Sequence, residues 1–242
     1  MGEPPQIYGV FSVTKQAETG MGGTAKDFVQ KTYWFVRRLA DDAFEVQPLN
    51  ENDVPSGLSS VINKREFTEQ YCAEVEYYQT KTLPHLKSLK EKIEKGEAHF
   101  KEGNFTQAEV QFGKALLIDP LNARANLGLG SVCCETKNYA KLKKILDTLV
   151  LNTDTFKEEQ RQQFNVFGIS LRKHKRFEEA ARIYAAAIAF DETDENLHFN
   201  IARVYYENGD KTKATEHVNR ALALSPEFKE AQKFRKVLAG SA

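Results

Sequence analysis

The sequence has few of the residue types that mark specialised classes of protein. Its 242 residues include only three cysteines, two methionines and one tryptophan. The 34 lysines and arginines equal the 34 aspartates and glutamates in number, so the formal net charge is zero. A neutral chain has no overall field that would draw it to nucleic acid or to an anionic membrane. We therefore expect no nucleic-acid partner, and the sequence leaves homo-oligomerisation open.

Long apolar runs are also missing. No segment approaches the roughly 18 consecutive apolar residues of a membrane helix. Met1 to Val13 lack the charged start and apolar core of a secretion signal. Cys133 and Cys134 are adjacent and Cys72 is distant from both, which makes a poor disulfide framework. These absences predict a cytoplasmic protein in a reducing compartment, with no membrane insertion.

No arrangement of residues is typical of an active site. The five histidines are not spaced as metal ligands, and no sequence feature nominates a histidine partner for Cys133 or Cys134. The stretch Gly20 to Thr24 lacks the Gly-Lys pair of a P-loop and the last glycine of a dinucleotide fingerprint, so it is interpreted as a loop. We predict no enzymatic activity, no cofactor and no bound metal.

The second half of the chain carries a period of 34 residues. The clearest unit has small and aromatic residues at Gly96, Phe100, Ala108, Phe112 and Ala115 and ends at Pro120, and the same skeleton returns at Ala202, Tyr205, Gly209, Ala214, Ala221 and Pro226. Such self-similarity is typical of stacked helix-turn-helix units. The spacing resembles the tetratricopeptide repeat, in which small residues let paired helices pack closely.

The resemblance implies a solenoid over about residues 89–239. Aligned on the small residue, its four units lie near 89–122, 123–160, 161–194 and 195–226, with a capping helix at 227–239. The one step of 38 residues places an insertion around Thr153 to Glu159. Leu142 and Leu149 stand where the second unit should have small residues, so we expect looser packing there.

Residues 1–73 follow another pattern, with short alternating runs that predict strands at 7–14, 29–39 and 44–49. The sequence predicts a tight turn at Ala40 to Ala43, an irregular segment at residues 50–60 and a short helix at residues 65–71. Residues 74–88 are interpreted as a helical connection to the repeats. The predicted fold class is α+β, mainly α: a repeat solenoid with a small N-terminal antiparallel sheet.

In tetratricopeptide arrays the first helix of each pair lines a concave groove that holds a partner polypeptide. The resemblance therefore implies groove positions in all four units: Lys90, Ile93, Glu97, Phe100, Arg124, Leu127, Ser131, Gln162, Asn165, Ile169, Arg172, Asn196, Phe199, Arg203 and Tyr206. Arginines that fork onto carboxylates and aromatics that serve as anchors suit an acidic or an amphipathic peptide. The carboxylate clamp that some family members use for chaperone tails is absent, because Ile93, Gly128 and Val166 occupy three of its places.

Three functions remain open on the sequence alone. The leading hypothesis is a non-enzymatic scaffold or adaptor whose groove binds a partner protein. The first alternative is a secretion- or assembly-type chaperone that shields an apolar segment. The second is a ligand-sensing N-terminal domain, with Lys31, Tyr33, Trp34, Arg37 and Arg38 as its most capable residues.

Overall fold

The computed structural model describes residues 6–19, 26–57 and 59–240. The chain forms two compact units. Unit 1 comprises Met1–Glu94 with Lys114–Asn122, and unit 2 comprises Lys95–Gly113 with Ala123–Ala242. The boundary falls inside two helices, α3 (Leu83–Lys101) and α4 (Phe105–Ile118). The glycines of the expected loop, at positions 20, 22 and 23, lie outside the described residues.

Unit 1 is built on an antiparallel sheet of five described strands in the order β4-β3-β2-β1-β5. The strands are β1 (Tyr8–Thr19), β2 (Lys26–Ala40), β3 (Ala43–Pro48), β4 (Ser60–Ile62) and β5 (Cys72–Ala73). The small antiparallel sheet is therefore confirmed, with a tight turn between β2 and β3. Runs of three and two residues carry no periodic signal, so β4 and β5 were not predicted.

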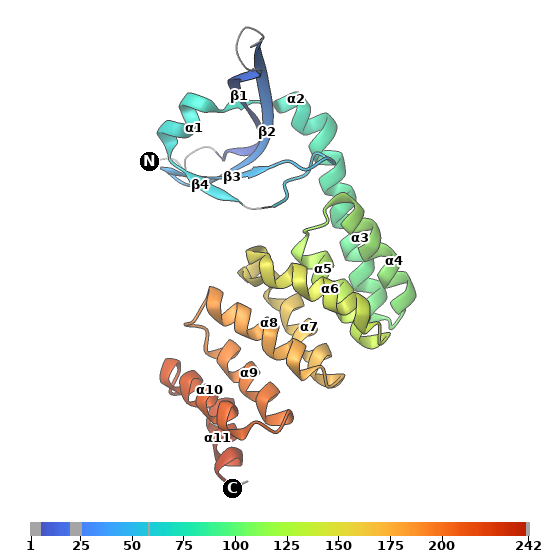
Figure 1. Ribbon diagram of the computed structural model, residues 1–242, viewed down its shortest axis with the longest axis vertical. Coiled ribbons are helices and arrows are strands. Elements are labelled where there is room, and N and C mark those ends of the chain that lie inside the picture. The colour runs from blue at the N-terminus through green and yellow to red at the C-terminus, as the bar shows by residue number, and fades with distance from the viewer. Residues whose placement is uncertain (1–5, 20–25, 58, 241–242) are drawn as a thin grey trace. The chain divides into compact units, whose positions relative to one another are not determined.

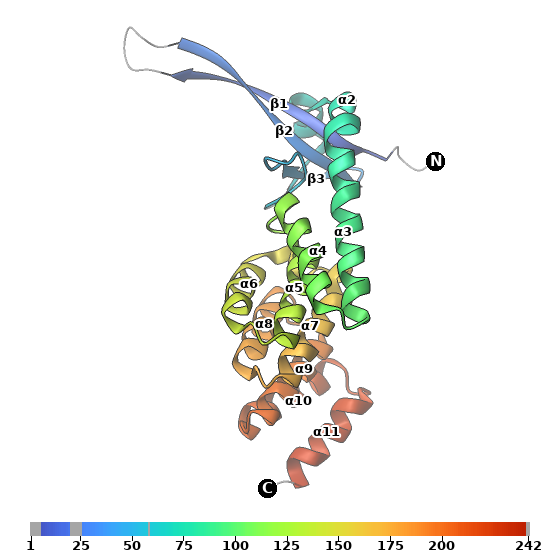
Figure 2. The same cartoon turned by 90° about the vertical axis from the view of Figure 1, so that its right-hand side faces the viewer.

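Where β2 pairs with β3, apolar side chains are buried on both faces of the sheet, as at Phe35 and Val36. On one face Val36, Phe44 and Val46 pack with Phe67 of α1 (Lys64–Gln70). The rings of Phe44 and Phe67 stack with centroids 4.4 Å apart. On the other face Phe35 is 8% exposed, and its ring centre lies 6.3 Å from that of Tyr78, which follows the strands in the chain. Figure 2 shows β1 and β2 continuing beyond β3 as a two-stranded ribbon.

Residues 75–101 are helical throughout, as α2 (Val75–Tyr77), a π-helical turn η2 (Tyr78–Thr82) and α3. Unit 1 also ties the irregular segment after β3 to the end of α4. Asn50 Nδ2 donates to the Ile118 carbonyl at 2.8 Å, and Ser56 Oγ donates to Asp119 Oδ1 at 2.7 Å. Carbonyls at a helix C-terminus lack partners inside the helix, so this loop supplies them.

Unit 2 is a solenoid of helix pairs (Figure 1). Its remaining helices are α5 (Ala123–Glu135), α6 (Tyr139–Leu151), α7 (Arg161–Lys173), α8 (Phe177–Phe190), α9 (Glu195–Glu207), α10 (Lys211–Leu224) and the capping helix α11 (Lys229–Gly240). Asn138, Asp194 and Asp210 start helices by accepting backbone N–H groups with their side chains. The predicted mainly helical α+β fold is confirmed.

The turns inside the helix pairs repeat one backbone conformation. Gly103, Lys137, Lys175 and Gly209 occupy equivalent positions with φ of 76°, 57°, 56° and 88°. This left-handed region suits glycine and costs other residues free energy. Two turns therefore carry the favourable residue and two carry a strained lysine.

The insertion between the second and third units forms two 3-10 turns, η3 (Thr153–Phe156) and η4 (Glu158–Gln160). Phe156 packs its ring 5.9 Å from those of both Phe164 and Phe190. Leu142 and Leu149 are 1% and 0% exposed. The large residues of the second unit are thus enclosed in the core, where the sequence had suggested looser packing.

Candidate functional site

The first helices of the pairs place one set of residues at equivalent positions. Steps of 34, 38 and 34 residues relate Glu97 to Ser131, Ile169 and Arg203. The equivalent row four positions earlier reads Ile93, Leu127, Asn165 and Phe199. Each row follows one side of successive helices, so its residues occupy comparable positions in the four units.

A cleft of about 440 Å³ lies in unit 2 at these helices. It is lined by Glu97, Phe100, Lys101, Phe112, Arg124, Gly128, Ser131, Gln162, Gln163 and Val166. Five of the residues implied by the resemblance are among them, namely Glu97, Phe100, Arg124, Ser131 and Gln162. The cleft brings together residues of α3, α4, α5 and α7, and its mixed apolar and polar lining is typical of a ligand site.

Phe112 forms part of the wall of the cleft because two glycines make room for it. A Cβ atom on Gly128 would lie 2.3 Å from Phe112 Cζ, and one on Gly96 would lie 2.7 Å from Phe112 Cε1. Phe112 itself is 0% exposed. The close approach of α3, α4 and α5 therefore depends on the absence of side chains at Gly96 and Gly128.

The guanidinium of Arg124 is already paired beside the cleft. Its Nε and Nη2 each donate to an oxygen of Glu97 at 2.7 Å, which is the bidentate geometry of a strong pair. Gln163 Nε2 donates to Glu97 Oε1 at 3.2 Å. An incoming carboxylate would have to compete with Glu97 for Arg124.

A second ion pair joins α7 to α9. Arg172 Nη2 and Nε donate to Glu207 Oε1 at 2.8 and 3.1 Å. Arg203 lies near this pair and has its guanidinium carbon 5.8 Å from the centre of the Phe199 ring. Burial, then the nearby Arg172 charge, lower the pKa of Arg203, while Glu207 opposes that shift. The two arginines thus share one glutamate.

The predicted aromatic anchors of the fourth unit contact the capping helix. Phe199 lies 5.0 Å from Phe228 and 6.0 Å from Phe234 between ring centres. Tyr206 meets Phe234 edge-on at 5.3 Å. These rings therefore contribute to the core between α9 and α11, and only part of each remains exposed.

The other predicted positions differ in exposure. Ile93 and Leu127 are 5% and 0% exposed, and Ser131 is 2% exposed with its hydroxyl donating to the Leu127 carbonyl. Lys90, Gln162, Ile169 and Asn196 are exposed, and Asn165 is half-buried. A partner can therefore reach only part of the predicted set.

Sequence reasoning did not assign Val166 to the site, although it lines the cleft and is 40% exposed. Ile169, one helical turn further along α7, is 57% exposed. Lys101 and Gln163 were also missed. The available signal was that Val166 lies four residues after Gln162, on the same side of the helix.

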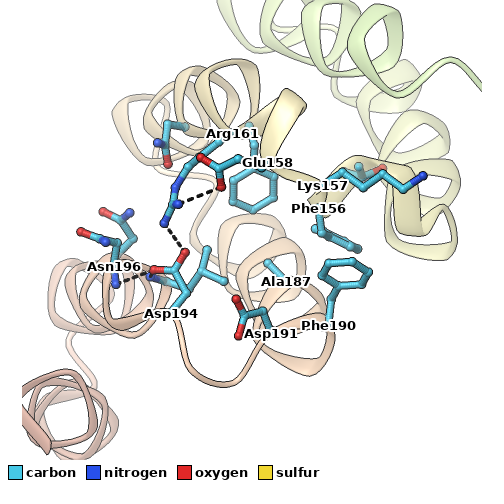
Figure 3. A pocket seen from close by; sticks show the side chains of 14 residues that line it. Phe156, Lys157, Glu158, Arg161, Ala187, Phe190, Asp191, Asp194 and Asn196 are labelled. Carbon is cyan, nitrogen blue, oxygen red and sulfur yellow. Dashed lines mark hydrogen bonds and ion pairs between the residues drawn. The ribbon is translucent and has the colours of Figure 1, made fainter. Parts of the chain in front are cut away.

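Unit 2 has a second, smaller recess of about 70 Å³ beside the insertion (Figure 3). Arg161 bridges Glu158, at 2.9 Å, and Asp194 there, while Phe156 faces Phe190. Asp194 also caps α9 by accepting from the backbone N–H of Asn196. These internal contacts make the recess a structural junction.

The cysteines of α5 are poor candidates for chemistry. Cys133 and Cys134 are 1% and 0% exposed. Burial raises the pKa of the Cys133 thiol to about 11 and that of Cys134 to about 12. Both thiols stay protonated at neutral pH, and the thiolate is the reactive form. In the part of the chain that the structure describes, no three His, Cys, Asp or Glu side chains gather as metal ligands.

Unit 1 has a recess of about 320 Å³ that includes Lys31, Tyr33 and Trp34 from the set predicted to sense a ligand. Arg37 and Arg38 pair elsewhere, with Glu45 and Asp41, each at 2.8 Å. Tyr33 stacks on Tyr77 at 4.2 Å. The functional groups of this recess thus contact one another.

None of the described helices is both long enough and apolar enough to cross a membrane.

A comparison with models of protein families finds a match. The family model described as tetratricopeptide repeat matches residues 99–160 and 171–238 of this chain. Among solved structures, the chain is similar to the crystal structure of MamA, with 20% identity, 60% of this chain and 83% of that chain covered, and a TM-score of 0.45. It is also similar to pilF of Pseudomonas aeruginosa, with 21% identity, 65% and 70% covered, and a TM-score of 0.48. No curated protein matches the chain.

Proposed function

Because the chain belongs to the tetratricopeptide repeat family, we propose that unit 2 is a non-enzymatic scaffold that binds an amphipathic segment of a partner protein along its first helices. Repeats of this family serve in general as protein-interaction modules. The finer assignment concerns where the segment binds and what it must look like.

The observation that carries the proposal is the exposed apolar pair Val166 and Ile169 on α7. They are 40% and 57% exposed, and Val166 lines the cleft of about 440 Å³. Phe100 adds aromatic surface to the same cleft. Burying such a side chain from full exposure contributes about 1.5–3 kcal/mol. Val166 and Ile169 are already partly buried, so a partner that covers the rest gains a fraction of that from each.

The ion pairs argue against a purely acidic partner. Arg124 is held by Glu97 and Arg172 by Glu207, so two of the three candidate arginines are already neutralised. A partner loses less binding free energy by contacting apolar side chains than by pairing with these arginines, because apolar contact displaces no existing ion pair. These contacts favour an amphipathic segment as the partner. Both a scaffold and a chaperone that shields an apolar segment would bind such a partner.

Site-specific photo-crosslinking in native lysate tests the proposal. The full-length protein would carry a photoreactive residue at Gln162 or, in a second sample, at Lys144 on α6 as the matched control. We expect one defined protein to crosslink from Gln162 and not from Lys144. Adding Ile169→Glu should abolish that crosslink, because a charge would replace the apolar anchor.

Equal labelling from Gln162 and Lys144, or labelling that survives Ile169→Glu, would exclude these helices as the binding surface. To distinguish a scaffold from a chaperone, the crosslinked partner would be studied in the absence of this protein. A partner that is stable alone indicates a scaffold, and one that aggregates without this protein indicates a chaperone.

A further inference from the structure

Arg203 is the arginine of the first-helix set that has no carboxylate of its own. In the described parts of the chain it makes a cation–π contact with Phe199 and no hydrogen bond or ion pair. Arg124 and Arg172, by contrast, each hold a glutamate at 2.7 and 2.8 Å. A guanidinium carries five donors, so Arg203 retains unused hydrogen-bonding capacity at a half-buried position.

The charges around Arg203 leave a local excess of one positive charge. Arg172 and Arg203 stand near a single carboxylate, that of Glu207. The Arg172 side chain is only 12% exposed, so water screens these charges incompletely. An added carboxylate would complete a set of two arginines and two acids.

The position of Arg203 along the solenoid gives the site a direction. The equivalent row of first-helix residues runs Glu97, Ser131, Ile169, Arg203. It passes from an acid, through a buried serine, to an exposed isoleucine and then to the unpaired cation. A segment lying across these helices therefore meets apolar surface at α7 and positive charge at α9.

We propose that Arg203 is a carboxylate-binding subsite, and that the bound segment carries an aspartate, a glutamate or its C-terminal carboxylate beside an apolar residue that covers Ile169. This inference rests on the proposed function and names the chemistry of the partner at one position. Bidentate pairing of arginine with a carboxylate gives both energy and orientation, so Arg203 sets which way the segment runs.

Selection from a displayed library of random 12-residue peptides on the full-length protein tests this assignment. Wild-type protein should select peptides that pair an apolar residue with an acidic one. Arg203→Ala should weaken the selected peptides by about tenfold or more, the size expected for a charged hydrogen-bonded contact. Arg220→Ala, on α10, is the matched control and should leave their affinity unchanged.

A charge reversal makes the result sharper. Selection on Arg203→Glu, after circular dichroism has shown that it is folded, should yield peptides with lysine or arginine in place of the acid. If wild type selects apolar peptides without acid enrichment, or if Arg203→Ala binds them equally well, the subsite is refuted while binding along the first helices stands. If wild type selects no peptide, the proposed function fails and this inference fails with it.

Discussion

The two units of this chain reach stability in different ways. In unit 1, residues distant in sequence meet: Ser12 pairs with Cys72 between strands, and Asn50 bonds to Ile118. In unit 2, each helix packs on near neighbours in the chain, and the same kind of contact, an aromatic ring against a glycine, recurs at Gly128 and Gly168. Unit 2 uses the same kind of packing contact in successive repeats, whereas unit 1 depends on contacts that each occur once.

The largest expected effect is a core deletion in unit 1. Phe44 is 1% exposed and stacks on Phe67, so Phe44→Ala should cost about 3–5 kcal/mol. The only tryptophan, Trp34, packs against this cluster, so its fluorescence reports unit 1 during urea unfolding. Far-UV circular dichroism reports mainly the helices. We expect the fluorescence transition to move to lower urea while the helical transition stays.

Val61→Ala on β4 is the control, because Val61 is 62% exposed. If Phe44→Ala moves both transitions equally, the two units unfold as one and the contrast drawn above does not hold.

The corresponding change in unit 2 is Gly128→Ala. The new Cβ would lie 2.3 Å from Phe112 Cζ, so Phe112 must shift, at a cost of about 1–3 kcal/mol. The helical transition in urea should move down and the Trp34 signal should not. At Gly113 a Cβ would meet nothing within 4 Å, so Gly113→Ala should be neutral or stabilising. Equal stability of both variants would mean that the ring contact is not needed.

Acid should weaken the last helix pair. His198 and His217 place their Nδ1 atoms 3.1 Å apart, so at most one of these atoms carries a proton. Burial lowers the pKa of both histidines below 6.5, and a positive neighbour, Arg220 for His198 and His198 for His217, lowers it further. The unfolded chain therefore binds protons more readily than the folded one. Stability should be complete above about pH 6.5 and fall as the pH drops below it.

Urea unfolding at a series of pH values measures this effect. His217→Gln should flatten the loss of stability on acidification, and His85→Gln, at an exposed position on α3, should leave it as in wild type. An unchanged pH profile in His217→Gln would remove the pair from the explanation.

The smallest expected effect compares the turns inside the repeats. Lys175 has φ of 56° where Gly209 has 88°. Lys175→Gly removes the strain of a side chain at a left-handed backbone position, but it also raises the conformational entropy of the unfolded chain. The net gain in the free energy of unfolding should be about 0.5 kcal/mol. Gly209→Lys should lose a similar amount. Thermal unfolding of the two variants measures both, and a loss in Lys175→Gly would show that the lysine side chain makes a compensating contact.

The structure groups part of the candidate site that the family resemblance implied, and the binding role of these residues stays a prediction. The resemblance placed Glu97, Phe100, Arg124 and Gln162 in the groove, and in the structure these four residues line one cleft. It could not reveal that Arg124 is occupied by Glu97, because that bond joins two helices whose side-chain conformations depend on packing. For the same reason it could not show that Phe199 packs against Phe228 and Phe234.

The sequence alone determined the helices of the solenoid, their pairing and the capping helix, since each depends on a local period and on residues at the helix ends. Only the tertiary structure decided the pairing of β5 with β1, the burial of Leu127 and the lack, in the described residues, of a hydrogen bond or ion pair from Arg203 to the nearby Glu207. These features depend on which side chains meet across elements, and a contact between distant residues leaves no periodic trace in one sequence.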